Sequence, residues 1–201
     1  VVIVNLYPFK QTVMSGKGFD EVVENIDIGG PTMLRSAAKN SGDVVVLTDP
    51  ADYEKALSEL EAGEVSRETR LYLMYKVYAH TAAYDSMISA YLAKKLGIDF
   101  PDSLTLAFEK KEQLRNGENP FQQAALYTDM FPVSNSIVNA RQENGKQLSY
   151  NNLNDSNGAI ELLKEFDEPT VVAVKHSNPC GVASGATIAE AYRKAYACDP
   201  V

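Results

Sequence analysis

The sequence lacks the features that would place it in a membrane, on a nucleic acid or in a disulfide framework. Two cysteines among 201 residues are too few for a disulfide scaffold and favour a reducing, cytoplasmic location. The apolar runs, such as Thr170–Val174, are far shorter than the about 18 residues of a membrane span, and no signal peptide is visible. A net charge of −8 repels phosphate backbones and argues against general nucleic-acid binding.

Metal chemistry is also poorly supported, because two histidines and two cysteines form no cluster with zinc-ligand spacing. What the chain does have is an ordinary globular composition, with 45% apolar residues and enough length for one or two domains. It begins at Val1 without a methionine and ends at Asp199-Pro200-Val201. We expect both ends to be cuts in a longer protein.

Apolar β-branched runs alternate with helical patterns along the whole chain, which predicts an α/β fold. A composition change near Pro101–Ser103 marks the expected domain boundary. Buried strands are predicted at Val1–Leu6, Asp43–Leu47 and Thr170–Lys175, and a further strand is predicted at Leu104–Phe108. Helices are predicted at Phe19–Ile26, Thr32–Asn40, Ala51–Ala62, Ser66–Leu96, Ser156–Phe166 (capped by Asp155) and Thr187–Cys198.

The segment Ser66–Leu96 is unusual because tyrosines and aliphatic residues cover more than one of its faces. A helix that is apolar nearly all round lies in a core or between subunits, and the sequence leaves both alternatives open. His80 within it is more typical of a satisfied core or interface histidine than of a ligand.

Turns that follow buried strands are the places where α/β proteins gather ligands. Asn5–Phe9 supplies an amide and a phenol at one such turn. Gly29-Gly30 precedes a helix, so its backbone N–H groups can approach an anion, although plain helix-capping turns have the same pattern. Lys39 lies further along that helix, where a lysine is usually solvated.

The turn from Lys175 to Gly181 brings Lys, His, Asn and Cys together after an apolar strand. A desolvated Lys175 with a lowered pKa beside His176 suits proton transfer. A thiolate nucleophile at Cys180 paired with His176 is an alternative, and so is a structural proline turn with Cys180 as a small apolar residue. Cys198 is expected in the core.

Ordered motifs identify a resemblance that covers the whole chain. The sequence resembles the bifunctional AICAR transformylase/IMP cyclohydrolase family. The motifs are Asn5–Phe9, Asp27–Gly30, Leu34–Asn40, His80–Asp85, Leu114–Pro120, Ser149–Asn152 and Lys175–Gly181.

The resemblance implies parts of two domains. Residues 1–102 would be the later part of a cyclohydrolase domain with a methylglyoxal-synthase-like parallel sheet, which closes formyl-AICAR to IMP. Residues 103–201 would begin a deaminase-like α/β transformylase domain without a catalytic metal. That domain transfers a formyl group from 10-formyltetrahydrofolate to AICAR, and the full-length protein would be a cytoplasmic homodimer.

The family motifs also imply residue roles. Tyr7, Asp27 and Lys39 fall on the cyclohydrolase site, where Lys and Tyr would donate to the developing oxyanion and Asp would orient or accept a proton. Asn5, Gly29 and Gly30 would position the nucleotide. The role that the family motif implies for Lys39 replaces its interpretation as an ordinary solvated lysine.

In the second domain, Lys175 and His176 fall on the catalytic pair, with His176 taking the proton of the AICAR amine. Contacts to the nucleotide are implied for Arg115, whose planar fork suits a phosphate, and for Asn152 and Asn178. Cys180 becomes structural. Two positions depart from the common family pattern: Asn116 replaces a tyrosine and cannot stack, and Phe121 replaces a histidine and cannot transfer a proton.

Competing hypotheses remain beside the bifunctional enzyme. One is a non-catalytic nucleotide-binding or dimerising module that kept the motifs, and another is an unrelated Cys–His acyl transferase. Because the family's phosphate loop, one site lysine and most of the folate site would lie outside these residues, we expect little or no activity from the isolated chain.

Overall fold

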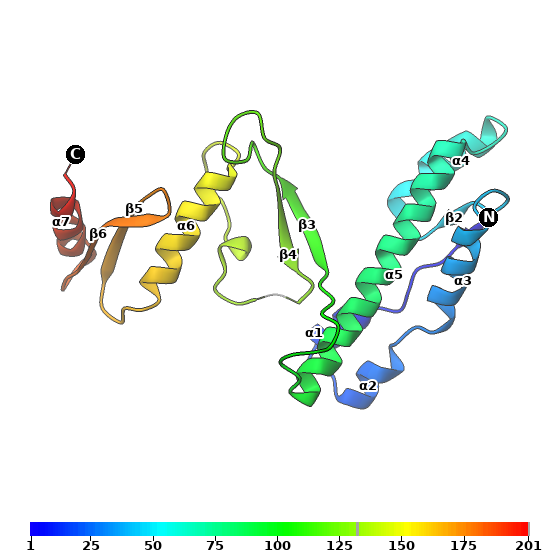
Figure 1. Cartoon of the computed structure of the whole chain (residues 1–201), viewed down its shortest axis with the longest axis horizontal. Coiled ribbons are helices and arrows are strands. Elements are labelled where there is room, and N and C mark those ends of the chain that lie inside the picture. Colours follow the sequence, from blue (N-terminus) through cyan, green and yellow to red (C-terminus); the bar gives the residue numbers. More distant parts are fainter. Residues whose placement is uncertain (132, 201) are drawn as a thin grey trace. The chain divides into compact units, whose positions relative to one another are not determined.

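A computed structural model describes residues 1–131 and 133–200, and the chain divides into two compact units, Val1–Phe108 and Glu109–Val201 (Figure 1). We describe each unit by itself. Both mix helices with small sheets, so the predicted α/β class is confirmed at this level.

The first unit is built around a short parallel sheet. Strands β1 (Val2–Ile3) and β2 (Val46–Leu47) pair in parallel, with Val2 opposite Val46. The helices of this unit are α1 (Phe9–Met14), α2 (Phe19–Glu24), α3 (Gly29–Lys39), the 3₁₀ helix η1 (Pro50–Asp52), α4 (Tyr53–Glu61) and α5 (Arg67–Leu96).

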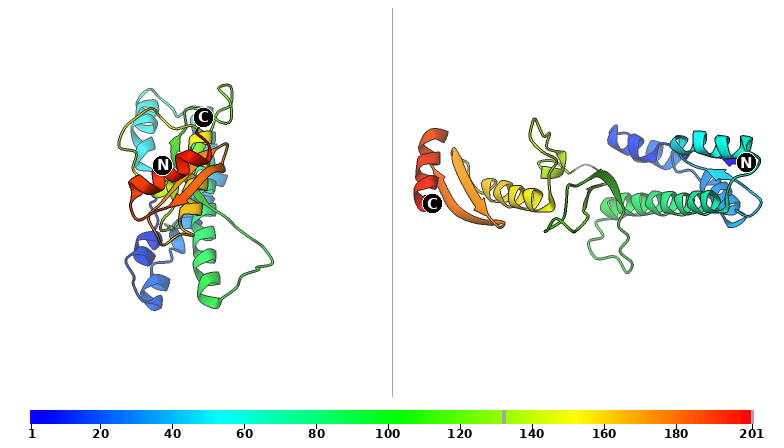
Figure 2. Two further views of the ribbon diagram at one scale, coloured as in Figure 1. Left: turned by 90° about the vertical axis from the view of Figure 1, so that its left-hand side faces the viewer. Right: turned by 90° about the horizontal axis from the view of Figure 1, so that it is seen from above.

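The core of this unit lies where α3 and α5 meet β2 (Figure 2). Leu34, Val46 and Val77 are almost completely buried there. The N-terminal strand was expected to be buried throughout, but Val1 and Ile3 are exposed, because β1 pairs with β2 and packs one face on the core.

Helix α5 begins and ends at capping residues that the sequence displays. The Ser66 hydroxyl accepts a hydrogen bond from the Thr69 N–H at 3.2 Å, and Gly97 ends the helix with a left-handed φ of 66°. Leu73 and Tyr84 on one face are buried, whereas Tyr75 is exposed. This helix therefore supplies one face to the core of its own unit. No helix in residues 1–131 and 133–200 is long and apolar enough to cross a membrane.

The second unit contains two separate pairs of strands. Strand β3 (Phe108–Gln113) neighbours β4 (Ala125–Asp129), and β5 (Thr170–Lys175) pairs antiparallel with β6 (Asn178–Ser184). The helices are η2 (Ile137–Asn139), α6 (Tyr150–Leu163) and α7 (Ile188–Cys198). Helix α7 packs directly on β6, since a Cβ added at Gly181 would clash with the Ala195 carbonyl oxygen.

Several predicted elements of this unit need correction. The strand predicted at Leu104–Phe108 is wrong: β3 instead comprises Phe108–Gln113, which are all exposed and mostly charged. Helix α6 begins at Tyr150 rather than at Ser156, because Ser149 and Asn152 form a reciprocal capping box. Asp155 therefore lies inside the helix. Strand β5 has the predicted bounds but is only partly buried, and Cys198 is exposed rather than in the core.

Candidate functional site

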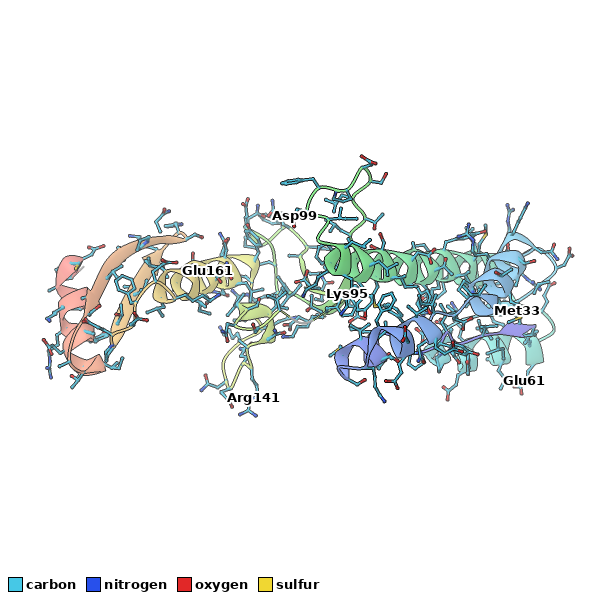
Figure 3. All side chains as sticks on the ribbon, turned by 90° about the horizontal axis from the view of Figure 1, so that it is seen from below. Met33, Glu61, Lys95, Asp99, Arg141 and Glu161 are labelled. Atoms are coloured by element: carbon cyan, nitrogen blue, oxygen red, sulfur yellow. The ribbon has the colours of Figure 1, made fainter. Side chains whose placement is uncertain are left out.

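A cavity of about 770 Å³ in the first unit gathers most of the residues predicted for ring closure. We call it the first cavity. It lies beyond β1 and at the start of α3, and Met33 of that helix, which also lines it, is labelled in Figure 3. Its lining residues are Val4, Asn5, Tyr7, Val23, Glu24, Ile26, Asp27, Ile28, Gly29, Gly30 and Met33.

Asp27 ties the turn after β1 to the start of α3. Its Oδ2 accepts the Tyr7 N–H at 3.2 Å and its Oδ1 accepts the Gly30 N–H at 2.7 Å. A carboxylate of the chain therefore occupies the position at this helix start where an external anion was expected. Gly30 is required by space, since an added Cβ would lie 2.7 Å from Asp27 Oδ2 and from Leu6 Cδ2.

Tyr84 is a residue of this site that the sequence interpretation missed. Its hydroxyl accepts the Asp27 N–H at 2.7 Å and donates to the Asn25 carbonyl at 3.3 Å. The side chain is buried, and burial raises the pKa of the phenol even though the hydrogen bond with the Asp27 backbone opposes that shift. Tyr84 thus stays neutral and fixes the turn from α5. Its place in the motif His80–Asp85 was the available signal.

Asn5 is held in place from two neighbouring segments. Its amide Nδ2 donates to the Thr48 carbonyl at 3.1 Å, and its Oδ1 accepts the Tyr53 hydroxyl at 3.3 Å. The side-chain amide is thereby fixed at the carboxyl ends of β1 and β2, where α/β proteins bind ligands.

Lys39 is not brought to the first cavity. It is exposed and lies at the opposite end of α3 from Gly29, which places it about 15 Å further along the helix at 1.5 Å per residue. Among the residues predicted for ring closure, the structure thus groups Asn5, Tyr7 and Asp27 with Gly29-Gly30 and separates Lys39 from them.

A second cavity, of about 560 Å³, lies in the second unit. It combines the start and one face of α6 with the tip of the β5–β6 hairpin. Lys175 and His176 both line it, and both are exposed, so the burial that the sequence predicted for Lys175 is absent. The full lining is Glu118, Tyr150, Asn151, Asn154, Asp155, Val174, Lys175, His176 and Ser177.

The hairpin tip has an unusual backbone. Lys175 pairs with Asn178, so His176 and Ser177 form a two-residue loop, with φ angles of 53° and 63°. Two consecutive left-handed residues are typical of the hairpin turns that favour Asn-Gly, and each non-glycine residue in this region costs about 1–2 kcal/mol. Asn178 Nδ2 donates to the His176 carbonyl at 2.7 Å and supports the turn.

Arg115 and Asn152 do not line the second cavity. Arg115 Nε donates to Asn116 Oδ1 at 3.2 Å, while Asn152 Oδ1 accepts the Ser149 N–H at 3.0 Å within the helix cap. Phe121, which replaces the histidine common in the family, is 98% exposed. Arg115 and Phe121 precede α6 in the chain, and Asn152 lies in its first turn. The first residue of α6, Tyr150, donates its N–H to the Asn116 carbonyl at 3.0 Å.

The geometry does not support a cysteine nucleophile. The Cys180 thiol donates to the Ala173 carbonyl at 3.6 Å across the hairpin and does not line the cavity that holds His176. Within residues 1–131 and 133–200, no cluster of three or more His, Cys, Asp or Glu side chains could hold a metal ion. His80 is half-buried in α5, where burial lowers its pKa.

The residues predicted for the two reactions thus line two different cavities, one in each unit of an α/β chain. The family described as the AICARFT/IMPCHase bienzyme matches residues 37–201, and the chain belongs to this family.

Relatives match over the whole chain. It is 56% identical over 204 residues to the "Bifunctional purine biosynthesis protein PurH" of Ruminiclostridium cellulolyticum and equally to that of Acetivibrio thermocellus. The protein of the same name from Bacillus mycoides is 55% identical over 202 residues. All of this chain is covered in each comparison, but it spans only 40% of the relatives' length.

Proposed function

We propose that this chain is part of an enzyme of purine biosynthesis that catalyses two reactions. One transfers the formyl group of 10-formyltetrahydrofolate to the amine of AICAR, and the other closes formyl-AICAR to IMP. The observation that carries the proposal is that Lys175 and His176 line the same cavity in a chain of the bienzyme family. The folate is a co-substrate, and the mechanism gives no part to a metal.

Formyl transfer suits the chemistry of the second cavity. The AICAR amine nitrogen attacks the formyl carbon while His176 accepts the amine proton. Lys175, as an ammonium ion, donates a hydrogen bond to the oxyanion that forms on the formyl oxygen. The bond between that carbon and the folate nitrogen then breaks, and the folate nitrogen takes up a proton as it leaves. Both side chains are exposed on the cavity rim and so within reach of a bound nucleotide.

Ring closure suits the first cavity. The carboxamide nitrogen of formyl-AICAR attacks the formyl carbon, and the oxygen of that carbon later leaves as water. The exposed Tyr7 hydroxyl is a donor for the developing oxyanion. Asp27, held by two backbone N–H groups, has an orienting role, and Asn5 with the Gly29-Gly30 turn positions the nucleotide. The position of Lys39 at the far end of α3, outside the cavity lining, does not support its predicted role as an oxyanion donor.

The same proposal includes the domains to which the residues belong, the contacts to the nucleotide and the assembly. Residues 1–102 would form the later part of the methylglyoxal-synthase-like cyclohydrolase domain, and residues 103–201 the start of the deaminase-like transformylase domain. Arg115, Asn152 of α6 and Asn178 of β6 would contact the nucleotide. A cytoplasmic homodimer is the expected assembly. The small sheets described above are consistent with these domains and support them only at the level of the α/β class.

The proposal is tested on a protein of the relatives' full length that carries this sequence, here called the full-length protein. Its His176→Ala variant should lose formyl transfer while it still binds AICAR, measured by calorimetry beside the rate assay. A Cys180→Ala variant serves as the control, and it should keep the activity. Formyl transfer that survives His176→Ala, or that disappears with Cys180→Ala alone, would contradict the proposal.

A non-catalytic nucleotide-binding module is a second candidate, and the replacement of the family's tyrosine by Asn116 favours it. Asn116 contacts Arg115 and the Gly117 carbonyl through its side chain and offers no ring for stacking. The wild-type full-length protein separates the two candidates, because such a module would bind AICAR and form no formyl-AICAR with any folate donor.

A further inference from the structure

Two side chains of α6 hold the hairpin tip that carries the proposed transformylase pair. We propose that Asp155, assisted by Asn154, is a positioning residue for Lys175 and His176. This inference rests on the proposed function of the second cavity. It concerns how the pair is kept in its conformation, and neither Asp155 nor Asn154 is given a part in the chemistry itself.

Ser177 is the point at which α6 holds the turn. Asp155 Oδ1 accepts the Ser177 N–H at 2.7 Å and the Ser177 hydroxyl at 3.3 Å. Asn154 Nδ2 donates to the same hydroxyl at 2.6 Å. Backbone and side chain of one turn residue are therefore held by adjacent residues of one helix.

Gly158 allows the turn to come this close to α6. An added Cβ at this position would lie 3.2 Å from the Ser177 carbonyl oxygen, tighter than ordinary van der Waals contact. Residues three and four positions apart share a helix face, so Gly158 lies on the same face as Asp155 and Asn154. The face thus combines hydrogen-bonding side chains with a gap that receives the hairpin tip.

The backbone of the tip explains why such support is needed. His176 and Ser177 are both left-handed, and neither is the glycine or asparagine that this hairpin turn favours. Strained conformations of this kind persist where the surrounding structure fixes them, and they gather at functional sites. The hydrogen bonds to Ser177 supply that restraint one residue away from His176, whose side chain lines the cavity.

Asp155 also lines the second cavity, so a direct part in the chemistry must be distinguished from positioning. Its Oδ1 is the acceptor for Ser177, and a negative charge is not required for accepting the Ser177 N–H. An amide oxygen can accept the same hydrogen bond. A positioning residue therefore tolerates Asp155→Asn, whereas a general base or a charge-pairing group does not.

The experiment measures formyl transfer by the full-length protein. Asp155→Ala should lower kcat by about 100-fold, the scale of a misplaced catalytic group, with the KM for AICAR little changed. Asp155→Asn should keep most of the activity. Asp167→Ala is the matched control, because Asp167 is an exposed aspartate outside the cavity, and it should behave as the wild type. Urea unfolding of each variant reports whether the unit that holds Asp155 has folded.

A second substitution tests the mechanism of positioning directly. Ser177→Gly removes the cost of the left-handed conformation at this residue, so it should restore much of the kcat that Asp155→Ala loses. Loss of activity in Asp155→Asn equal to that in Asp155→Ala, or no rescue by Ser177→Gly, would overturn the inference. Unchanged kcat in Asp155→Ala would do the same, provided that His176→Ala abolishes transfer. Transfer that survives His176→Ala would instead refute the proposed function on which the inference rests.

Discussion

The contrast between Gly29 and Gly30 gives a sharp test of the first cavity, because these neighbours begin the same helix in different surroundings. A Cβ at Gly30 would meet Asp27 Oδ2 and Leu6 Cδ2, each at 2.7 Å, whereas a Cβ at Gly29 would meet nothing within 4 Å. Neither glycine has a positive φ. The predicted difference between Gly30→Ala and Gly29→Ala is therefore a matter of space alone.

The size of the effect follows from the contacts that must give way. Relief of the clash moves the Asp27 carboxylate and weakens its hydrogen bonds to the N–H groups of Tyr7 and Gly30. Overpacking costs about 1–3 kcal/mol, and loss of those partly exposed hydrogen bonds stays within that range. Gly29→Ala should be neutral or stabilising by about 0.5–1 kcal/mol, since alanine favours the helix.

The assay is urea unfolding of both variants and the wild type, followed by the cyclohydrolase rate in the full-length protein. Gly30→Ala should lower the free energy of unfolding and lose most of the ring-closure activity, because Asp27 is displaced. Gly29→Ala should retain the free energy of unfolding and should lose less of the ring-closure activity than Gly30→Ala, because Asp27 keeps its place. Equal effects of the two substitutions would refute the assignment of Asp27 as the residue that fixes this turn.

Further predictions concern α5. Tyr84→Phe should lower the free energy of unfolding by about 1–3 kcal/mol, because the Asp27 N–H loses its acceptor; an unchanged urea midpoint would show that water replaces the phenol. Burial lowers the pKa of His80 below its ordinary 6.5, so the unfolded chain binds a proton more readily than the folded one. The free energy of unfolding should thus be fully retained above pH 6.5 and fall as the pH drops below it. His80→Gln should flatten this dependence, and the lowered pKa of Asp49 adds its own loss only at more acidic pH. A pH profile unaffected by His80→Gln would contradict this explanation.

The sequence predicted best those elements whose ends carry clear local signals. Helix α5 was placed within one residue, because Ser66 caps its start and Gly97 allows the left-handed residue at its end. Strand β5 follows Pro169 and consists of β-branched residues, and its bounds matched. Strand β3 was missed because its residues, from Phe108 to Gln113, are nearly all polar and exposed and show no alternation.

The errors around the second cavity have two physical causes. The cap of α6 uses Asn152 where a capping box ordinarily has Glu or Gln, so Asp155 seemed the better cap. The hairpin has His176 and Ser177 in left-handed conformations that usually require glycine or asparagine, so a longer turn was expected. The cap is a local contact between Ser149 and Asn152, whereas the turn is held by contacts between α6 and the hairpin, which no local pattern reveals.

The candidate site could be predicted as residue types but not as a geometry. Tyr7, Asp27, Lys175 and His176 were identified through the family motifs, and the structure places each in a cavity. Lys39 was predicted in a helix that begins after Gly29-Gly30, whereas α3 includes both glycines, and its length separates Lys39 from Gly29. The supporting contacts of Tyr84 and Asp155 join segments far apart in the chain and needed the structure.

The most direct test of the account measures both activities in one pair of variants of the full-length protein. His176→Ala should abolish formyl transfer to AICAR and leave the closure of formyl-AICAR intact, and Asp27→Ala should abolish closure and leave formyl transfer intact. This opposite pattern is expected because the two residues line separate cavities in separate units. Loss of both activities in either correctly folded variant, or of neither activity in both variants, would contradict the assignment of one reaction to each cavity.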